Sequence, residues 1–127
     1  MNSSESQVVL FKPLDRIDLQ SGMALSEKMN EITPNPNQLW IIDLASVDFM
    51  DSSGLVPLVN ALKTARTNGC RLVLCNVRTP VRLVLELTQL DSFFEIFNSY
   101  EDALVTANCN PGTTVKFTDL NGKQVQV

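Results

Sequence analysis

The run of six residues that ends at Leu44 places the tightest limit on the fold. Leu39-Trp40-Ile41-Ile42-Asp43-Leu44 is almost wholly apolar and does not alternate between apolar and polar side chains. A strand with one wet face alternates, whereas a strand that is covered on both faces reads as a continuous apolar run. We therefore expect residues 39–44 to form a strand that is buried on both faces.

Strand-like and helix-like patterns alternate along most of the chain. Short apolar runs are followed by amphipathic segments with helical spacing. The expected strands cover residues 8–11, 39–44 with a continuation over 47–50, 72–75 and 93–97, and the expected helices cover 18–32, 55–67, a segment opened by Thr79-Pro80, and 100–107. This order predicts an α/β fold with a mostly parallel sheet and right-handed crossovers.

The carboxyl-terminal residues follow a different pattern. Asn110-Pro111-Gly112 interrupts the alternation, and Asn121-Gly122 lies between two short segments of alternating polarity. Asn-Gly in that setting is a strong hairpin signal. We expect one domain over residues 1–109 and a tail over 110–127 that is a candidate β-hairpin, which either docks on the sheet edge or stays mobile.

The composition excludes several classes of function. The 127-residue chain has a net charge of −4 and no histidine, so Ser-His-Asp catalysis, Cys-His catalysis and His-ligated metal sites are ruled out. The ten basic residues are scattered, which argues against a nucleic-acid partner. Cys70, Cys75 and Cys109 form no Cys-x-x-Cys pair, and we expect them to be small core residues. We predict a protein that is not an enzyme and has no metal or cofactor.

The amino-terminal residues lack the basic and apolar regions of a signal peptide. The longest apolar runs are also far shorter than a membrane span. We expect a cytoplasmic protein without a membrane partner.

A polar turn, Asp51-Ser52-Ser53-Gly54, follows the strand pattern and opens a helix. Small polar residues at a helix start satisfy backbone N–H groups, and capping alone is enough to account for them. Alternatively, one hydroxyl is a phosphorylation switch. A phosphate there would be tolerated by the helix amino terminus and repelled by a partner built to cover a neutral serine.

Several stretches together resemble the STAS domain of bacterial anti-sigma factor antagonists. They are Ile41-Ile42-Asp43-Leu44, the run from Val47 to the Asp-Ser-Ser-Gly-Leu core at 51–55, Leu14-Asp15, the segment 69–74, and the segment 80–90 ahead of Phe93-Phe94-Glu95-Ile96. The match covers about residues 7 to 107 in the order of elements. It implies a single STAS domain, with helices packed on a mixed, mostly parallel sheet.

The resemblance also implies a partner-switching function. Ser52 is the serine that the family phosphorylates, and Ser53 is its neighbour. The kinase is an anti-sigma factor of the Bergerat ATPase fold, which the unphosphorylated antagonist binds so that the sigma factor is released. A PPM-type serine phosphatase restores the active form. The partner-binding residues that the resemblance implies are Asp15, Asp51, Ser52, Ser53, Gly54 and Leu55.

Two prolines depart from the family pattern. Pro13 stands where the family often has a flexible Gly-x pair, and Pro57 falls early in the helix after the turn, so that helix is expected to start late or to bend. Two other functions stay open. One is a scaffold module in a larger regulatory complex, and the other is a small-anion carrier, which the lack of a Gly-rich phosphate loop makes the weaker of the two.

Overall fold

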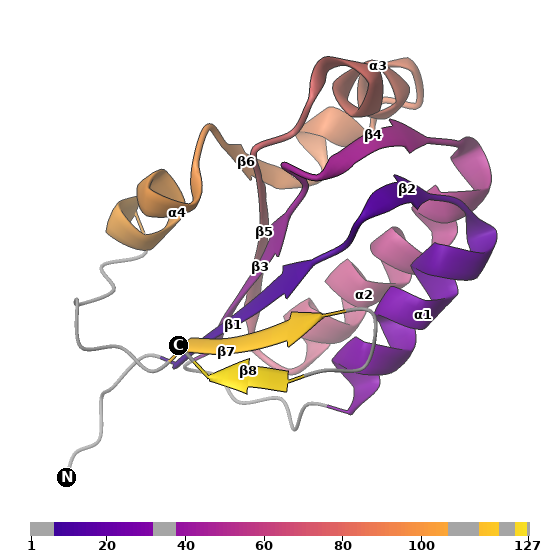
Figure 1. The fold of residues 1–127 in the computed structure, drawn as a ribbon. Coiled ribbons are helices and arrows are strands. Elements are labelled where there is room, and N and C mark those ends of the chain that lie inside the picture. The colour runs from indigo at the N-terminus through magenta and orange to yellow at the C-terminus, as the bar shows by residue number, and fades with distance from the viewer. Residues whose placement is uncertain (1–6, 32–37, 107–114, 120–123, 127) are drawn as a thin grey trace, which may run out of the picture.

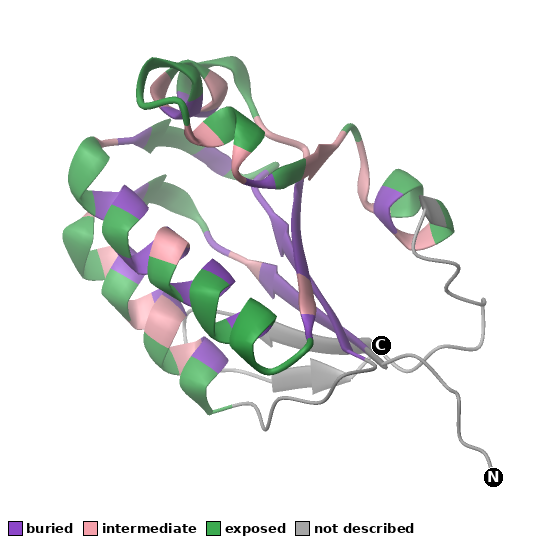
Figure 2. Cartoon of the chain, turned by 180° about the vertical axis from the view of Figure 1, so that it is seen from behind, coloured by how far each residue is buried: buried purple, intermediate pink, exposed green. Residues whose placement is uncertain are grey.

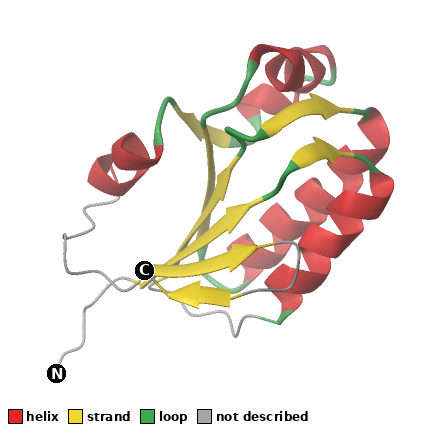
Figure 3. Cartoon of the chain, in the orientation of Figure 1, coloured by secondary structure: helices red, strands yellow, loops and turns green. Residues whose placement is uncertain are grey.

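The computed structural model describes residues 7–31, 38–106, 115–119 and 124–126. Its elements alternate as the sequence predicts (Figures 1 and 3). The strands are β1 (Gln7–Lys12), β2 (Asp15–Ile17), β3 (Gln38–Asp43), β4 (Val47–Met50), β5 (Arg71–Cys75), β6 (Glu95–Phe97), β7 (Val115–Asp119) and β8 (Gln124–Gln126). The helices are α1 (Leu19–Asn30), α2 (Leu55–Thr67), α3 (Thr79–Leu87) and α4 (Tyr100–Thr106), with short 3₁₀ turns η1 (Ser52–Gly54) and η2 (Leu90–Ser92).

A six-stranded sheet in the order β6-β5-β3-β1-β7-β8 forms the centre of the fold. All neighbouring strands run parallel except β7 and β8, which pair antiparallel. The predicted fold class is confirmed. Strand β7 pairs with β1 and extends the sheet, so the tail hairpin docks on the sheet edge. The expected domain boundary between 109 and 110 lies outside the described residues.

The two central strands explain why the sequence does not alternate there. Every residue of β3 is buried. Alternate side chains of β1 and β3 enter two separate core clusters, one on each face of the sheet. The larger cluster includes Val9, Phe11, Trp40 and Ile42, and the smaller one includes Val8, Leu10, Leu39 and Ile41. Helix α4 covers the smaller cluster through Ala103, and Figure 2 shows the buried strands between the helices.

A short two-stranded ribbon, β2 and β4, leaves one end of this sheet (Figure 1). Strand β1 ends before Pro13-Leu14 and is followed by β2, and β3 ends before residues 44–46 and is followed by β4. Strands β2 and β4 then pair in parallel with each other. At the break, the Asp15 N–H donates to the Ser46 carbonyl at 2.9 Å. Within this ribbon, β2 leads into α1, and β4 leads through η1 into α2.

The amino ends of α1 and α2 lie close together. Asp18 caps α1, with its carboxylate accepting from the Ser21 N–H at 2.9 Å. A Cβ added at Gly22 would lie 3.0 Å from the Pro57 ring, so this glycine lets the two helices approach. Helix α2 begins at Leu55, directly after η1, and Pro57 is buried in its first turn, where a backbone N–H has no helical partner to lose. The expected late start of this helix was therefore wrong.

Candidate functional site

The polar turn after β4 is held to β2 and closed by Asp51. The Asp51 N–H donates to the Ile17 carbonyl at 3.2 Å, which extends the ribbon by one residue. The Asp51 carboxylate then accepts from the Gly54 N–H at 3.2 Å and from the Ser53 hydroxyl at 2.5 Å. Asp51 is thus the amino-terminal cap of η1, and the capping interpretation of this residue is confirmed.

Gly54 is required by space rather than by backbone conformation. Its φ is −75°, which any residue adopts, but a Cβ there would lie 2.6 Å from the Ile17 carbonyl oxygen. Gly54 and Leu55 are both buried, and Leu55 belongs to the larger core cluster. These two residues therefore fix the backbone of the turn from the inside.

The two serines of the turn differ in how their hydroxyls are used. Both side chains are exposed. The Ser53 hydroxyl donates to Asp51, whereas the Ser52 hydroxyl makes no hydrogen bond to any residue that the structure describes. Ser52 is therefore an exposed serine with an unengaged hydroxyl at the entry to α2.

Asp15 lies at the opposite end of the ribbon from the serine turn. It is exposed, has a left-handed φ of 69°, and is in register with Val47 rather than with the end of β4. At the usual rise of about 3.3 Å per strand residue, Ser52 is about 16 Å further along the chain from Val47. The structure thus brings Asp51, Ser52 and Ser53 together and places Asp15 apart from them.

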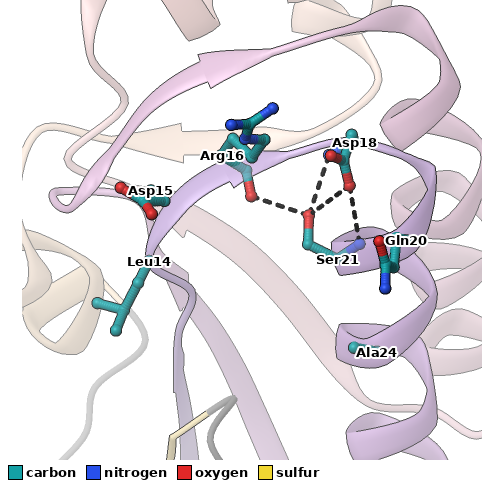
Figure 4. A pocket seen from close by; sticks show the side chains of 7 residues that line it. All are labelled: Leu14, Asp15, Arg16, Asp18, Gln20, Ser21 and Ala24. Atoms are coloured by element: carbon teal, nitrogen blue, oxygen red, sulfur yellow. Dashed lines mark hydrogen bonds between the residues drawn. The ribbon is translucent and has the colours of Figure 1, made fainter.

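Two surface depressions adjoin the ribbon and share Asp15 and Arg16. One, of about 300 Å³, is lined by these residues with Asp48 and Phe49. The other lies between β2 and the first turns of α1 (Figure 4), and its lining residues are Leu14, Asp15, Arg16, Asp18, Gln20, Ser21 and Ala24. Carboxylates outnumber the single guanidinium in each lining, which does not suit a small anion.

The pKa of Asp18, at the edge of the second depression, lies below its usual value. The main cause is the hydrogen bond from the Ser21 backbone, opposed by burial and supported by the Ser21 hydroxyl and the charge of Arg16. Figure 4 shows these hydrogen bonds between Asp18 and Ser21, together with the bond from the Ser21 hydroxyl to the Arg16 carbonyl. Asp18 and Ser21 therefore use their side chains to cap the amino terminus of α1.

Sequence reasoning missed Arg16, Asp48 and Phe49 as surface residues beside the site. Phe49 is 48% exposed although it is a large apolar residue in a strand and directly precedes the buried Met50. Val47 and Met50 of the same strand are buried, so the strand does not follow a simple alternation. No pattern in the sequence distinguishes Phe49 from a core residue.

The buried thiols are core groups. Cys70 and Cys75 are both buried, as expected, and Cys109 lies outside the described residues. Burial raises the pKa of Cys75 to about 12, and the charges of Asp43 and Glu101 add to the shift. In the described part of the chain, no cluster of three or more His, Cys, Asp or Glu side chains could hold a metal ion. None of the described helices has the length and apolar character that a membrane crossing requires.

Comparisons with known proteins agree with this architecture. An anti-sigma F factor antagonist from Paenibacillus polymyxa is 30% identical over 64 residues, which are 50% of this chain and 55% of that protein. The chain thus matches about half the length of this curated relative.

Solved structures extend the similarity to most of the fold. The crystal structure of an anti-sigma factor antagonist from Mycobacterium paratuberculosis is 27% identical, with a TM-score of 0.60 over 75% of this chain and 80% of that one. A sulfate transporter family protein from Wolinella succinogenes has the same fold at 18% identity, with a TM-score of 0.70 over 80% of this chain and 84% of that one. The STAS domain family model matches residues 4–103, and the chain therefore belongs to the STAS domain family.

Proposed function

We propose that this protein is an anti-sigma factor antagonist that phosphorylation of Ser52 switches off. In its unphosphorylated form it binds an anti-sigma factor that is also a serine kinase, and the target of that factor is released. The similarity to two antagonists supports the general role. The observation that carries the switch is the exposed Ser52 hydroxyl, which has no hydrogen-bond partner among the described residues.

The hydrogen bonds of the turn favour Ser52 over Ser53 as the phosphate acceptor. A kinase must bring the attacking hydroxyl in line with the γ-phosphate. Ser53 would first have to release the Asp51 carboxylate, to which it donates at 2.5 Å. That carboxylate would then face the incoming phosphate. The Ser52 hydroxyl can be phosphorylated without breaking a hydrogen bond to Asp51.

The phosphate would act on the partner interface rather than on the fold. It adds a charge of about −1.5 to −2 beside the Asp51 carboxylate. On the free protein the group stays in water, next to the N–H groups that open η1 and α2. Against a partner that covers a neutral serine, it would be desolvated without a matching charge, which costs several kcal/mol. Binding is therefore lost while the domain stays folded.

The proposed contact surface consists of Asp51, Ser52 and Ser53, with Asp15 as a second contact about 16 Å away along the ribbon. Gly54 and Leu55 belong to the same segment but act from inside, by holding its backbone against Ile17 and the core. The partners in this proposal are a kinase of the Bergerat ATPase fold and a PPM-type phosphatase that reverses the modification. A cytoplasmic location belongs to the same proposal.

The test measures the dissociation constants of variants for such a kinase from the same cell. Ser52→Ala should bind within about threefold of the wild type, and Ser52→Asp at least about a hundredfold more weakly, which corresponds to about 2.7 kcal/mol. Ser92→Asp, at an exposed serine of η2 outside the proposed contact surface, is the matched control for added charge and should bind like the wild type. Equal binding of Ser52→Ala and Ser52→Asp would contradict the proposal.

A scaffold module in a larger complex is the second candidate. It is favoured by the cap itself, because the bonds of Asp51 to Gly54 and Ser53 account for these polar residues without any modification. In that case neither substitution at Ser52 changes complex formation. A small-anion carrier would instead show a thermal shift with its ligand, and the acidic linings of both depressions argue against it.

A further inference from the structure

Helix α3 has an apolar stripe on its outer side as well as on its inner side. Val81 and Leu85 are fully buried in the larger core cluster. At about 100° per residue, Leu83 and Leu87 lie on the opposite side of the helix, one turn apart. Leu83 is 52% exposed and Leu87 84% exposed, the largest fraction among the large hydrophobic residues that the structure describes. A lone exposed leucine is ordinary, but two in line form an unpartnered stripe.

The position of α3 leaves this stripe accessible. The inner side of the helix packs on β4, and η2 follows it closely in the chain. Figures 1 and 2 show α3 at the periphery of the fold, beyond β4 and away from the six-stranded sheet. A second helix can therefore lie along its outer side without meeting the sheet or α1 and α2.

Two charged residues beside the stripe are unfavourably placed with respect to the dipole of α3. Arg82 and Glu86 are one turn apart, and neither forms an ion pair within the described residues. Arginine near the amino end and glutamate near the carboxyl end both oppose the helix dipole. The order of arginine before glutamate is also the weaker one for a pair four residues apart. The two charges are therefore poorly matched inside one copy of α3.

An antiparallel second copy of α3 satisfies all of these groups at once. A two-fold axis between Arg82 and Glu86 brings Arg82 of each copy beside Glu86 of the other. It also brings Leu83 of one copy against Leu87 of the other. The two helix dipoles then run in opposite directions, which is favourable. The surface is self-complementary, as a two-fold interface requires.

We propose that the protein forms a two-fold dimer through the outer stripe of α3, defined by Leu83 and Leu87, with reciprocal Arg82–Glu86 ion pairs. Ser52 is not part of this stripe, so the dimer does not depend on the proposed function. Failure of the dimer would leave the switch untouched, and failure of the switch would leave the dimer untouched.

Sedimentation over a series of protein concentrations tests the dimer. The wild type should approach twice the chain mass of 14.1 kDa as its concentration rises. Arg82→Glu and Glu86→Arg should each raise the dimer dissociation constant at least tenfold. The exposed Lys63 on α2 provides the matched control, because Lys63→Glu changes a surface charge away from the stripe and should leave the dimer intact.

Charge exchange makes the test specific. The double variant Arg82→Glu/Glu86→Arg should dimerise like the wild type. A mixture of the two single variants should form a heterodimer, because one offers only carboxylates and the other only guanidiniums. A mass of 14.1 kDa at every concentration would overturn the proposal. A dimer that neither reversal weakens, or that the double variant fails to restore, would overturn it as well.

Discussion

The Ser53 hydroxyl donates to the Asp51 carboxylate at 2.5 Å, two residues back in the same turn. This bond makes the two neighbouring serines different, because the Ser53 hydroxyl has a hydrogen-bond partner and the Ser52 hydroxyl has none among the described residues. The same carboxylate caps η1 through the Gly54 N–H. One aspartate thus starts the helix and distinguishes the two serines.

Asp51→Ala should destabilise the domain by about 1 kcal/mol, because the cap is lost and the Gly54 N–H loses its acceptor. Asp51→Asn keeps an acceptor oxygen and should stay within a few tenths of a kcal/mol of the wild type. Urea unfolding followed by circular dichroism measures both values. Equal stability of the alanine and asparagine variants would show that the cap contributes nothing.

Gly54→Ala should cost about 1–3 kcal/mol, since the added methyl group would lie 2.6 Å from the Ile17 backbone oxygen and the ribbon would have to shift. Gly22→Ala is the matched comparison. Its methyl group would meet the Pro57 ring at 3.0 Å and the Gly54 carbonyl oxygen at 3.3 Å, a milder overlap than at Gly54, and alanine is preferred over glycine in a helix interior by up to about 1 kcal/mol. Thermal unfolding of both variants should therefore rank Gly54→Ala well below Gly22→Ala.

Stability should fall in acid partly through Glu95. The two hydrogen bonds from Arg71, at 2.8 and 2.6 Å, hold the pKa of Glu95 below its usual value of 4.5, against a smaller opposing effect of burial. A carboxyl group whose pKa is lowered by folding stabilises the protein above its unfolded-state pKa and loses that contribution as pH falls through the folded-state pKa. The loss should therefore begin as pH drops below about 5.

Glu95→Gln should reduce stability at pH 7 and flatten the decline on the acid side. Arg71→Gln should do the same, because it removes the cause of the shift. Unfolding free energies measured between pH 7 and pH 3 test both variants. An acid-side slope that neither substitution changes would show that this pair is not responsible.

The central architecture could be predicted because burial on two faces leaves a direct mark on the sequence. The absence of alternation in β3 follows from the two core clusters that its side chains enter. The expected helix over 18–32 corresponds to α1, which Asp18 caps. The tail hairpin followed from Asn121-Gly122, although its place beside β1 depends on pairing between distant segments, which local patterns do not encode.

The finer features of the site depend on distances between separate elements. Pro57 was expected to delay α2, but η1 leads into the helix so that the proline falls in the first turn. The exposure of Phe49 depends on how the ribbon turns away from the sheet. Likewise, Asp15 was expected to bind the same partner as the serine turn, and this stays a prediction because the ribbon places Asp15 at the other end. The unequal use of Ser52 and Ser53 is visible only in the hydrogen bonds.

The most direct test of the account is the site of phosphate on the protein from its own cells. Intact-mass measurement over several growth conditions, followed by peptide mapping of the segment that contains both serines, separates the possibilities. The account predicts a phosphorylated fraction that carries its phosphate on Ser52 and none on Ser53. Phosphate on Ser53 alone, or no phosphate under any condition, would contradict it.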